Sequence, residues 1–156
     1  MTDDEKTVQF AVTLLKENAI VGVISGGALR EFEEVVSHIK PGARMLKARV
    51  PYIPGKKDRL LAGAIIELLG MPILGRSIST DRAWDAIAVA TKGQYDMVVI
   101  QNADLLDGRS LDFVSRASLP SVVLVGGDRL KALLEGKKWF HKQGLFHAGD
   151  PYIIPQ

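Results

Sequence analysis

The sequence contains no cysteine among its 156 residues. This absence excludes disulfide scaffolds, cysteine-ligated zinc, iron–sulfur clusters and thiol nucleophiles. Long apolar runs are missing too, since Gly, Lys or Asp interrupts them well short of the ~18–20 residues that cross a membrane. The first residues are acidic and lack the apolar core of a signal peptide. We therefore expect a soluble, cytoplasmic protein with no membrane partner.

Side chains for metal or hydrolytic chemistry are also scarce. The three histidines, His38, His141 and His147, are spaced too far apart to indicate a zinc site without cysteine support. No serine stands in the Gly-x-Ser-x-Gly turn that exposes a hydrolase nucleophile. We expect neither a metal site nor a catalytic triad.

Hydrophobic residues make up 47% of the chain, enough for a core in one domain that spans residues 1–156. The net charge is only +2, but the stretch from Lys40 to Leu60 holds seven cations and one anion. Such a stretch fits either a contact surface for phosphates or an ordinary solvated face.

Strand-like and helix-like segments alternate along the chain. Apolar runs that Gly or polar residues end indicate buried strands, and apolar residues at helical spacing indicate helices. The expected strands cover 19–24, 44–50, 97–100, 121–125 and 152–154, and helices are expected from 2 to 18, from 29 to 39, from 58 to 69, from 80 to 91, after 110 and from 130 to 135. This alternation predicts an α/β fold with a doubly wound parallel sheet.

Local signals predict how some helices begin and which aromatic residues are buried. Asp58 and Thr80 are typical helix N-caps, and Thr2 with Glu5 fits a capping box. We expect Trp84 to lie in the core. The aromatic pair at 139–140 follows two lysines, and either packs on the sheet edge or contacts a nucleic acid or a partner.

In doubly wound sheets, ligands bind at the carboxyl ends of the strands. The chain has three segments there, at 25–29, 101–104 and 126–129. In the first, the template Gly-x-x-x-x-Gly-Lys-Ser/Thr of a phosphate-binding loop can be placed only with Ala28 at the Lys position and Leu29 at the hydroxyl position. Gly26 and Gly27 therefore form either a tight turn or a weak anion site.

The second segment follows the expected strand that ends at Ile100. An ATPase would carry two acidic residues here, to hold Mg²⁺ and to activate water. This chain has Gln101 and Asn102 instead. Amides are poorer Mg²⁺ ligands than carboxylates and cannot act as a general base. The sequence therefore argues against catalysis.

With these motifs identified, the chain resembles the core of AAA+ ATPases, and within them the transposition-associated branch that selects target DNA. The resemblance rests on the order of elements, on Val98–Leu106, which is similar to a Walker B stretch, and on Val122–Leu130, which is similar to a later strand of that branch. It implies a RecA/AAA+-like three-layer sandwich. Because the sequence ends soon after the last expected strand, we expect this sandwich without the helical lid.

The departures from that family imply loss of ATP hydrolysis. The Walker A and Walker B side chains are replaced. Glycine stands at 126–127, where the family has a polar residue that senses the nucleotide. No arginine stands at 140–145, where the family's arginine finger would be expected. Gly26, Gly27, Gln101 and Asn102 would form only a degenerate nucleotide site, with no cofactor. A nucleotide-binding ATPase that a partner subunit completes with ATP and Mg²⁺ is the alternative. A different small ligand at the glycine turns is a third hypothesis.

The resemblance also points to DNA or an ATPase as partner. Lys56, Lys57 and Arg59 follow the second expected strand, where related DNA-assembling ATPases place basic contacts. We expect these three side chains to contact DNA phosphates. We expect the chain to work by interaction, with DNA, with an active AAA+ ATPase or by self-association.

Overall fold

The computed structural model of the chain describes residues 3–16, 21–71, 78–136 and the backbone of 153–154. Its centre is a five-stranded sheet in the order β2-β3-β4-β1-β5, in which every neighbouring pair is parallel. The strands are β1 (Val21–Ile24), β2 (Met45–Arg49), β3 (Met97–Gln101), β4 (Ser121–Val125) and β5 (Ile153–Ile154). All five lie where the sequence predicts strands.

Burial of the strands explains their composition. Every residue of β1 and β4 is buried, as is β3 up to Ile100, because helices cover both faces of the central sheet. In the edge strand β2, burial alternates, and the side chains of Lys47 and Arg49 are exposed. The basic character that the sequence shows around residue 45 therefore comes partly from one uncovered face of this strand.

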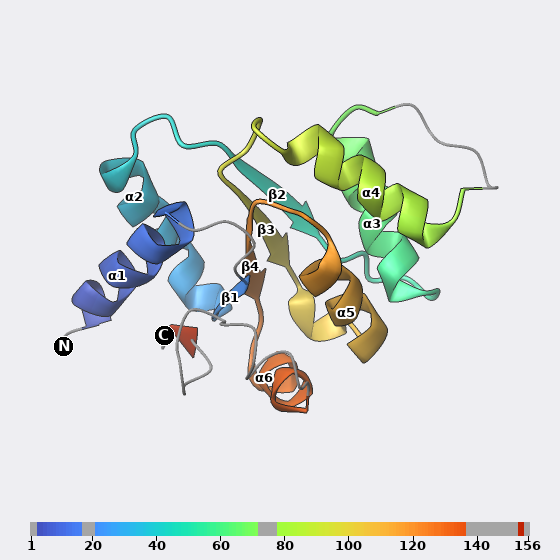
Figure 1. Cartoon of the computed structure of the whole chain (residues 1–156). Helices are drawn as coiled ribbons and strands as arrows, with labels where there is room; N and C mark the ends of the chain where they lie inside the picture. Colours follow the sequence, from blue (N-terminus) through green and yellow to red (C-terminus); the bar gives the residue numbers. More distant parts are fainter. Residues whose placement is uncertain (1–2, 17–20, 72–77, 137–152, 155–156) are drawn as a thin grey trace.

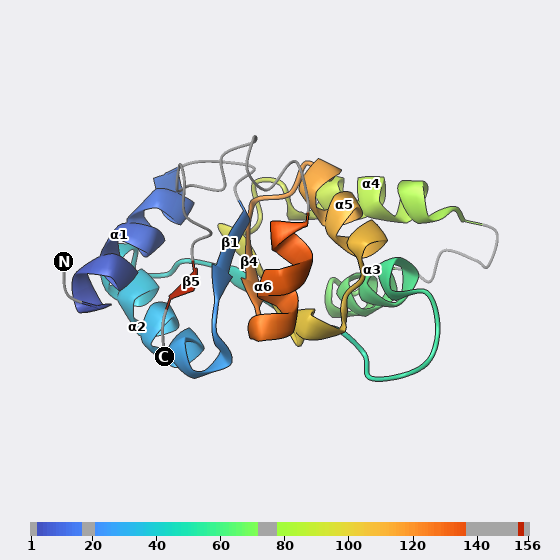
Figure 2. The same cartoon turned by 90° about the horizontal axis from the view of Figure 1, so that it is seen from below.

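Helices cover both faces of the sheet (Figures 1 and 2). The helices are α1 (Asp3–Lys16), α2 (Leu29–Ile39), α3 (Lys57–Leu68), α4 (Thr80–Thr91), α5 (Gly108–Arg116) and α6 (Asp128–Glu135), with short 3₁₀ turns η1 (Gly26–Ala28) and η2 (Ala103–Leu105). One apolar cluster joins α1 and α2 to one face, and a second joins α3 to α6 to the other. The three-layer α/β sandwich expected from the sequence is confirmed.

Each apolar layer is anchored by large side chains. Phe10 of α1 and Phe32 of α2 lie with their ring centroids 5.3 Å apart over one face. Trp84 of α4 is buried in the other layer, as the sequence predicts.

Two of the predicted helix caps are wrong. Ser79, not Thr80, is the N-cap of α4, and its hydroxyl accepts a hydrogen bond from the Arg82 N–H at 3.2 Å. Asp58 is not an N-cap either, because α3 begins one residue earlier and Lys56 occupies the cap position. Asp58 is instead only 2% exposed and lies 3.3 Å from the Arg109 Nε of α5. Thr2, the aromatic pair at 139–140 and the segment 140–145 lie outside the described residues.

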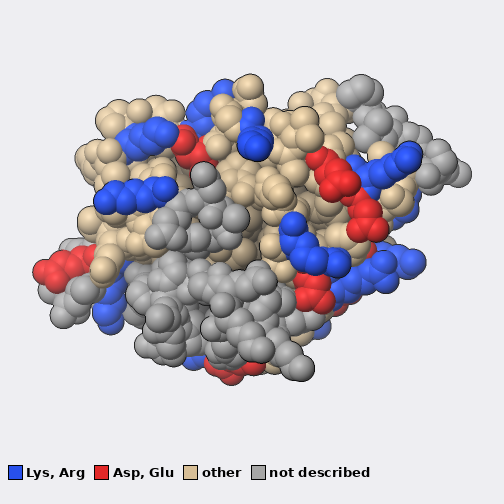
Figure 3. Space-filling view, viewed as in Figure 1, with Lys and Arg blue, Asp and Glu red and all other residues tan. Residues whose placement is uncertain are grey.

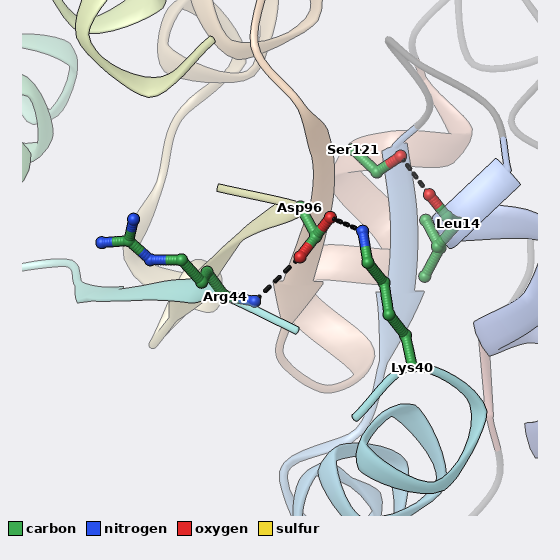
Figure 4. A network of polar contacts seen from close by, with 5 residues as sticks. All are labelled: Leu14, Lys40, Arg44, Asp96 and Ser121. Carbon is green, nitrogen blue, oxygen red and sulfur yellow. Dashed lines mark hydrogen bonds and ion pairs between the residues drawn. The ribbon is translucent and has the colours of Figure 1, made fainter. Parts of the chain in front are cut away.

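A polar cluster links the segments that enter the sheet at its amino edge (Figure 4). Asp96 accepts hydrogen bonds from the Lys40 ammonium and, at 2.8 Å, from the backbone N–H of Arg44. The Lys40 bond is the main cause that lowers the pKa of Asp96, against a smaller opposing effect of burial. The Ser121 hydroxyl donates to the Leu14 carbonyl at 2.6 Å and so ties β4 to α1. This edge is therefore fixed by structural contacts, opposite the edge that carries the candidate site.

Within the described ranges, no helix is long and apolar enough to cross a membrane.

Candidate functional site at the carboxyl edge of the sheet

A polar depression of about 470 Å³ opens at the carboxyl ends of β1, β3 and β4. Its lining comes from the three segments that the sequence predicts to meet there, together with the end of β2: Gly26, Leu29, Arg49, Gln101, Asn102, Asp104, Val125, Gly126 and Gly127. The structure thus brings together three of the four residues proposed as a degenerate nucleotide site, and places Gly27 in the same turn as Gly26. We call this depression the edge pocket.

The turn after β1 is very short. Only Ser25 separates the last strand residue, Ile24, from the first turn of helix at Gly26. The Ala28 N–H donates to the Ser25 carbonyl at 3.1 Å and closes this turn. Ala28, which stands at the Lys position of the phosphate-loop template, is buried in the same apolar cluster as Phe32. The chain therefore passes from strand to helix without an extended loop.

Asn102 turns the chain sharply at the end of β3. Its φ of 58° and ψ of 36° place it in the left-handed region, which asparagine tolerates better than most residues. Its carbonyl accepts a hydrogen bond from the Leu105 N–H at 3.0 Å. The asparagine is thus explained by backbone conformation, whether or not it also contacts a ligand.

Gln101 is held by a neighbouring cation. The Arg49 guanidinium donates to Gln101 Oε1 from Nε at 3.3 Å and from a terminal nitrogen at 3.1 Å. Arg49 is the one cation among the described residues that line the edge pocket, and that lining includes no lysine. Asp104 contributes one carboxylate to the same lining, so the described lining is balanced in charge.

Asp104 connects the end of β3 to the start of α6. Its two carboxylate oxygens accept the Gly127 N–H at 3.0 and 2.9 Å, and Oδ1 also accepts the Leu130 N–H at 2.7 Å. These are N–H groups at the beginning of a helix, which attract anions because of the helix dipole. An internal carboxylate therefore already occupies the anion-binding position at this end of α6.

Gly126 is required by this close approach. A Cβ added there would lie 2.9 and 3.0 Å from Leu130 side-chain atoms and 3.1 Å from Asp104 Oδ1. At Gly26 an added Cβ would meet nothing within 4 Å. Gly26 and Gly126 are therefore different: packing requires a residue without a side chain at Gly126 and leaves room for one at Gly26.

The three basic candidates do not line the edge pocket: Lys56 ends the loop between β2 and α3, and Lys57 and Arg59 lie in the first turn of α3. The connection between β2 and α3, residues 50–56, projects from the body of the molecule (Figure 2). Lys56 caps α3 and is exposed, as is Arg59. The Lys57 ammonium donates to the Ile53 carbonyl at 2.9 Å. The structure therefore places Lys56, Lys57 and Arg59 within one helical turn, with Lys57 bracing the loop.

On the face seen in Figure 3, basic and acidic side chains are interspersed, without a broad field of one sign. The described residues also contain no group of three or more His, Asp or Glu side chains placed to hold a metal ion.

Sequence reasoning missed Arg49 and Asp104 as site residues. Arg49 could have been found, because it ends a predicted strand and the carboxyl ends of parallel strands meet at one edge. Asp104 gave a weaker signal, since its hydrogen-bond partners lie 23 and 26 residues further along the chain.

The arrangement of strands, layers and edge pocket defines a class of fold. It is the RecA/AAA+-like α/β fold, a parallel sheet between two helical layers with its ligand edge at the strand carboxyl ends. No protein-family model matches the chain, and no curated protein matches its sequence.

Solved structures with a similar fold are Orc/Cdc6 AAA+ ATPases. The chain is similar to the ORC2 protein of Aeropyrum pernix in its ADP form (TM-score 0.62, 16% identity, 94% of this chain and 45% of that one). The structure of its ADPNP-ADP complexes is similar with a TM-score of 0.57 and 14% identity, over 91% of this chain and 43% of that one. The Cdc6p of Pyrobaculum aerophilum is similar with a TM-score of 0.61 and 18% identity, over 96% of this chain and 44% of that one. The chain thus spans less than half the length of each, and at these identities the likeness establishes the fold.

Proposed function

We propose that this chain is a non-catalytic, AAA+-like interaction module that associates with DNA through the loop between β2 and α3. The observation that carries the non-catalytic part is the turn after β1. A phosphate-binding loop needs several residues whose N–H groups surround the phosphates, followed by a lysine. Here one residue separates strand from helix, and the lysine position is a buried alanine.

The other side chains of the edge pocket support the same proposal. Gln101 is engaged by Arg49, and Asn102 serves a left-handed turn. Asp104, the carboxylate nearest to these amides along the chain, uses both oxygens on backbone N–H groups of the β4–α6 connection. Gln101 and Asp104 are thus engaged by groups of the protein itself, and the amide of Asn102 cannot act as a general base.

The basic turn of α3 supports the DNA part. Lys56, Lys57 and Arg59 stand at the N-terminal end of a helix, where the helix dipole makes cations unfavourable by a few tenths of a kcal/mol or more each. The helix dipole therefore does not favour a basic cluster there, although the Lys57 ammonium also braces the loop through the Ile53 carbonyl. Phosphate binding would account for these cations, because a positive cluster on an exposed loop attracts the negatively charged DNA backbone. The resemblance to DNA-selecting ATPases of the transposition branch is in keeping with this role.

Nucleotide binding, completed by a partner subunit, is the second candidate. It is favoured by the bound ADP and ADPNP named for the Aeropyrum structures and by the position of the edge pocket at the strand ends. The balanced charge of the pocket disfavours it, since the triphosphate would meet the Asp104 carboxylate and only one arginine.

Binding to a labelled DNA duplex, measured by fluorescence anisotropy at about 50 mM salt, tests the proposal. The Lys56→Glu/Lys57→Glu variant is expected to bind about tenfold more weakly or worse, with a smaller salt dependence, because phosphate contacts are lost.

The matched control is Lys16→Glu/Lys92→Glu. It makes the same change in net charge at exposed lysines at the ends of α1 and α4, which lead toward the opposite edge of the sheet. The control is expected to bind almost as well as the unchanged protein. Equal affinity of the Lys56/Lys57 variant and the unchanged protein would refute the proposed DNA contact.

A further inference from the structure

The loop between β2 and α3 exposes two adjacent large apolar side chains. Tyr52 is 85% exposed and Ile53 is 53% exposed, and Tyr52 is the most exposed large apolar residue in the described part of the chain. Single exposed apolar residues are ordinary. Here two such residues are adjacent in the middle of the projecting loop, and the basic first turn of α3 follows a few residues later, so apolar surface and positive charge lie close together in the sequence.

The conformation of this loop is fixed by its own contacts. At its start, the Val50 N–H donates to the Gln101 carbonyl at 3.0 Å. At its end, the Lys57 ammonium holds the Ile53 carbonyl, and Gly55 takes a φ of +140° that other residues rarely adopt. Prolines at 51 and 54 further restrict the backbone on both sides of the exposed pair. The backbone of the apolar pair is therefore held in a defined conformation, so little backbone entropy remains to be lost on binding.

The chemistry of the pair and its neighbours selects the ligand. An exposed aromatic ring gains by stacking on another flat ring, and nearby Lys56 and Arg59 favour a polyanion. Single-stranded nucleic acid supplies both, because its bases are accessible and its phosphates follow at regular intervals. In a duplex the bases stack on each other, and the ring has no base face to contact.

We propose that Tyr52 stacks on an unpaired base of DNA, with Ile53 packed beside it and the basic turn of α3 on the neighbouring phosphates. This proposal rests on the proposed function, since it uses the same loop, and it adds the substrate class: DNA with exposed bases, bound in preference to a closed duplex.

The test compares oligothymidylate of about 20 nucleotides with a duplex of equal length, both by anisotropy at low salt. Tyr52→Ala is expected to weaken single-strand binding roughly 5- to 150-fold, the range that corresponds to losing one stacked base, and to leave duplex binding unchanged. Tyr52→Phe is expected to keep the affinity. Tyr52→Trp is expected to bind with quenching of the added indole fluorescence.

Val89→Ala provides the matched control, because Val89 of α4 is 79% exposed and lies on a different surface. It is expected to change neither affinity. If Tyr52→Ala binds oligothymidylate as well as the unchanged protein, or weakens single strand and duplex equally, the stacking proposal is wrong while the basic-loop proposal stands. If the unchanged protein binds neither DNA, the proposed function fails, and the stacking proposal fails with it.

Discussion

Asp104 and Gly127 join two neighbouring strand ends: both carboxylate oxygens of the aspartate accept the one glycine N–H, at 3.0 and 2.9 Å. With the additional bond from the Leu130 N–H, this carboxylate fastens the start of α6 to the end of β3. The contact turns what would otherwise be an anion-binding helix end into a closed structural joint. Most of our expectations for the edge pocket follow from it.

Removal of this joint should destabilise the fold. Asp104→Ala loses a charged capping group and leaves helix N–H groups without their acceptor, so we expect a loss of about 2 kcal/mol in the free energy of unfolding. Asp104→Asn keeps an acceptor oxygen and should lose less. Urea unfolding followed by circular dichroism measures both, and equal stability of Asp104→Ala and the unchanged protein would contradict the assignment.

The two glycine turns should respond differently to a methyl group. Gly126→Ala places a Cβ against Leu130 and Asp104, and is expected to cost about 1–3 kcal/mol through overpacking. Gly26→Ala adds its Cβ in open space and should cost less than about 1 kcal/mol. Thermal unfolding of the two variants in parallel gives the comparison. The reverse order of stabilities would show that the turn after β1 is the closely packed one.

The hydrogen bonds at Asp96 predict a pH dependence of stability. Because the Lys40 ammonium lowers the pKa of Asp96 in the folded protein, its stabilisation is complete above the ordinary value of 3.8 and is lost as the pH falls through the lowered pKa. Asp96→Asn should therefore reduce stability at neutral pH and flatten the loss of stability in acid. Urea midpoints measured from pH 7 down to about 3 test this, and parallel pH curves for the variant and the unchanged protein would argue against it.

The ion pair between Asp58 of α3 and Arg109 of α5 predicts that their substitutions are coupled in their effect on stability. Asp58 is buried, whereas the side chain of Arg109 is 68% exposed and also lies over the ring of Phe113. Arg109→Ala should destabilise by about 1–2 kcal/mol, because a buried carboxylate loses its cation while water screens part of the effect. Asp58→Asn in the same background should recover part of that loss. A double-mutant cycle measures the coupling, and a coupling near zero would contradict the pair.

The sequence predicts the centre of the sheet well because β1, β3 and β4 are buried on both faces. Runs such as Val98–Ile100 and Val122–Val125 admit few alternatives to a buried parallel strand, and their ends place the edge pocket correctly. The errors come from contacts between distant segments. Aspartate is a common helix cap, but Asp58 lies inside α3 and pairs with Arg109, which is 51 residues further along the sequence. Asp104 of η2 likewise depends on N–H groups at the start of α6, which begins only after α5 and β4, and no local pattern reveals this contact.

The central claim, a fold of the AAA+ kind without nucleotide chemistry, is tested most directly by calorimetric titration with ATP and ADP, with Mg²⁺ and with EDTA, in low-salt buffer. We expect no detectable heat up to millimolar nucleotide, because one residue separates β1 from the following 3₁₀ turn and Asp104 occupies the start of α6. Micromolar, Mg²⁺-dependent binding would contradict the proposed non-catalytic role and would favour nucleotide binding completed by a partner subunit.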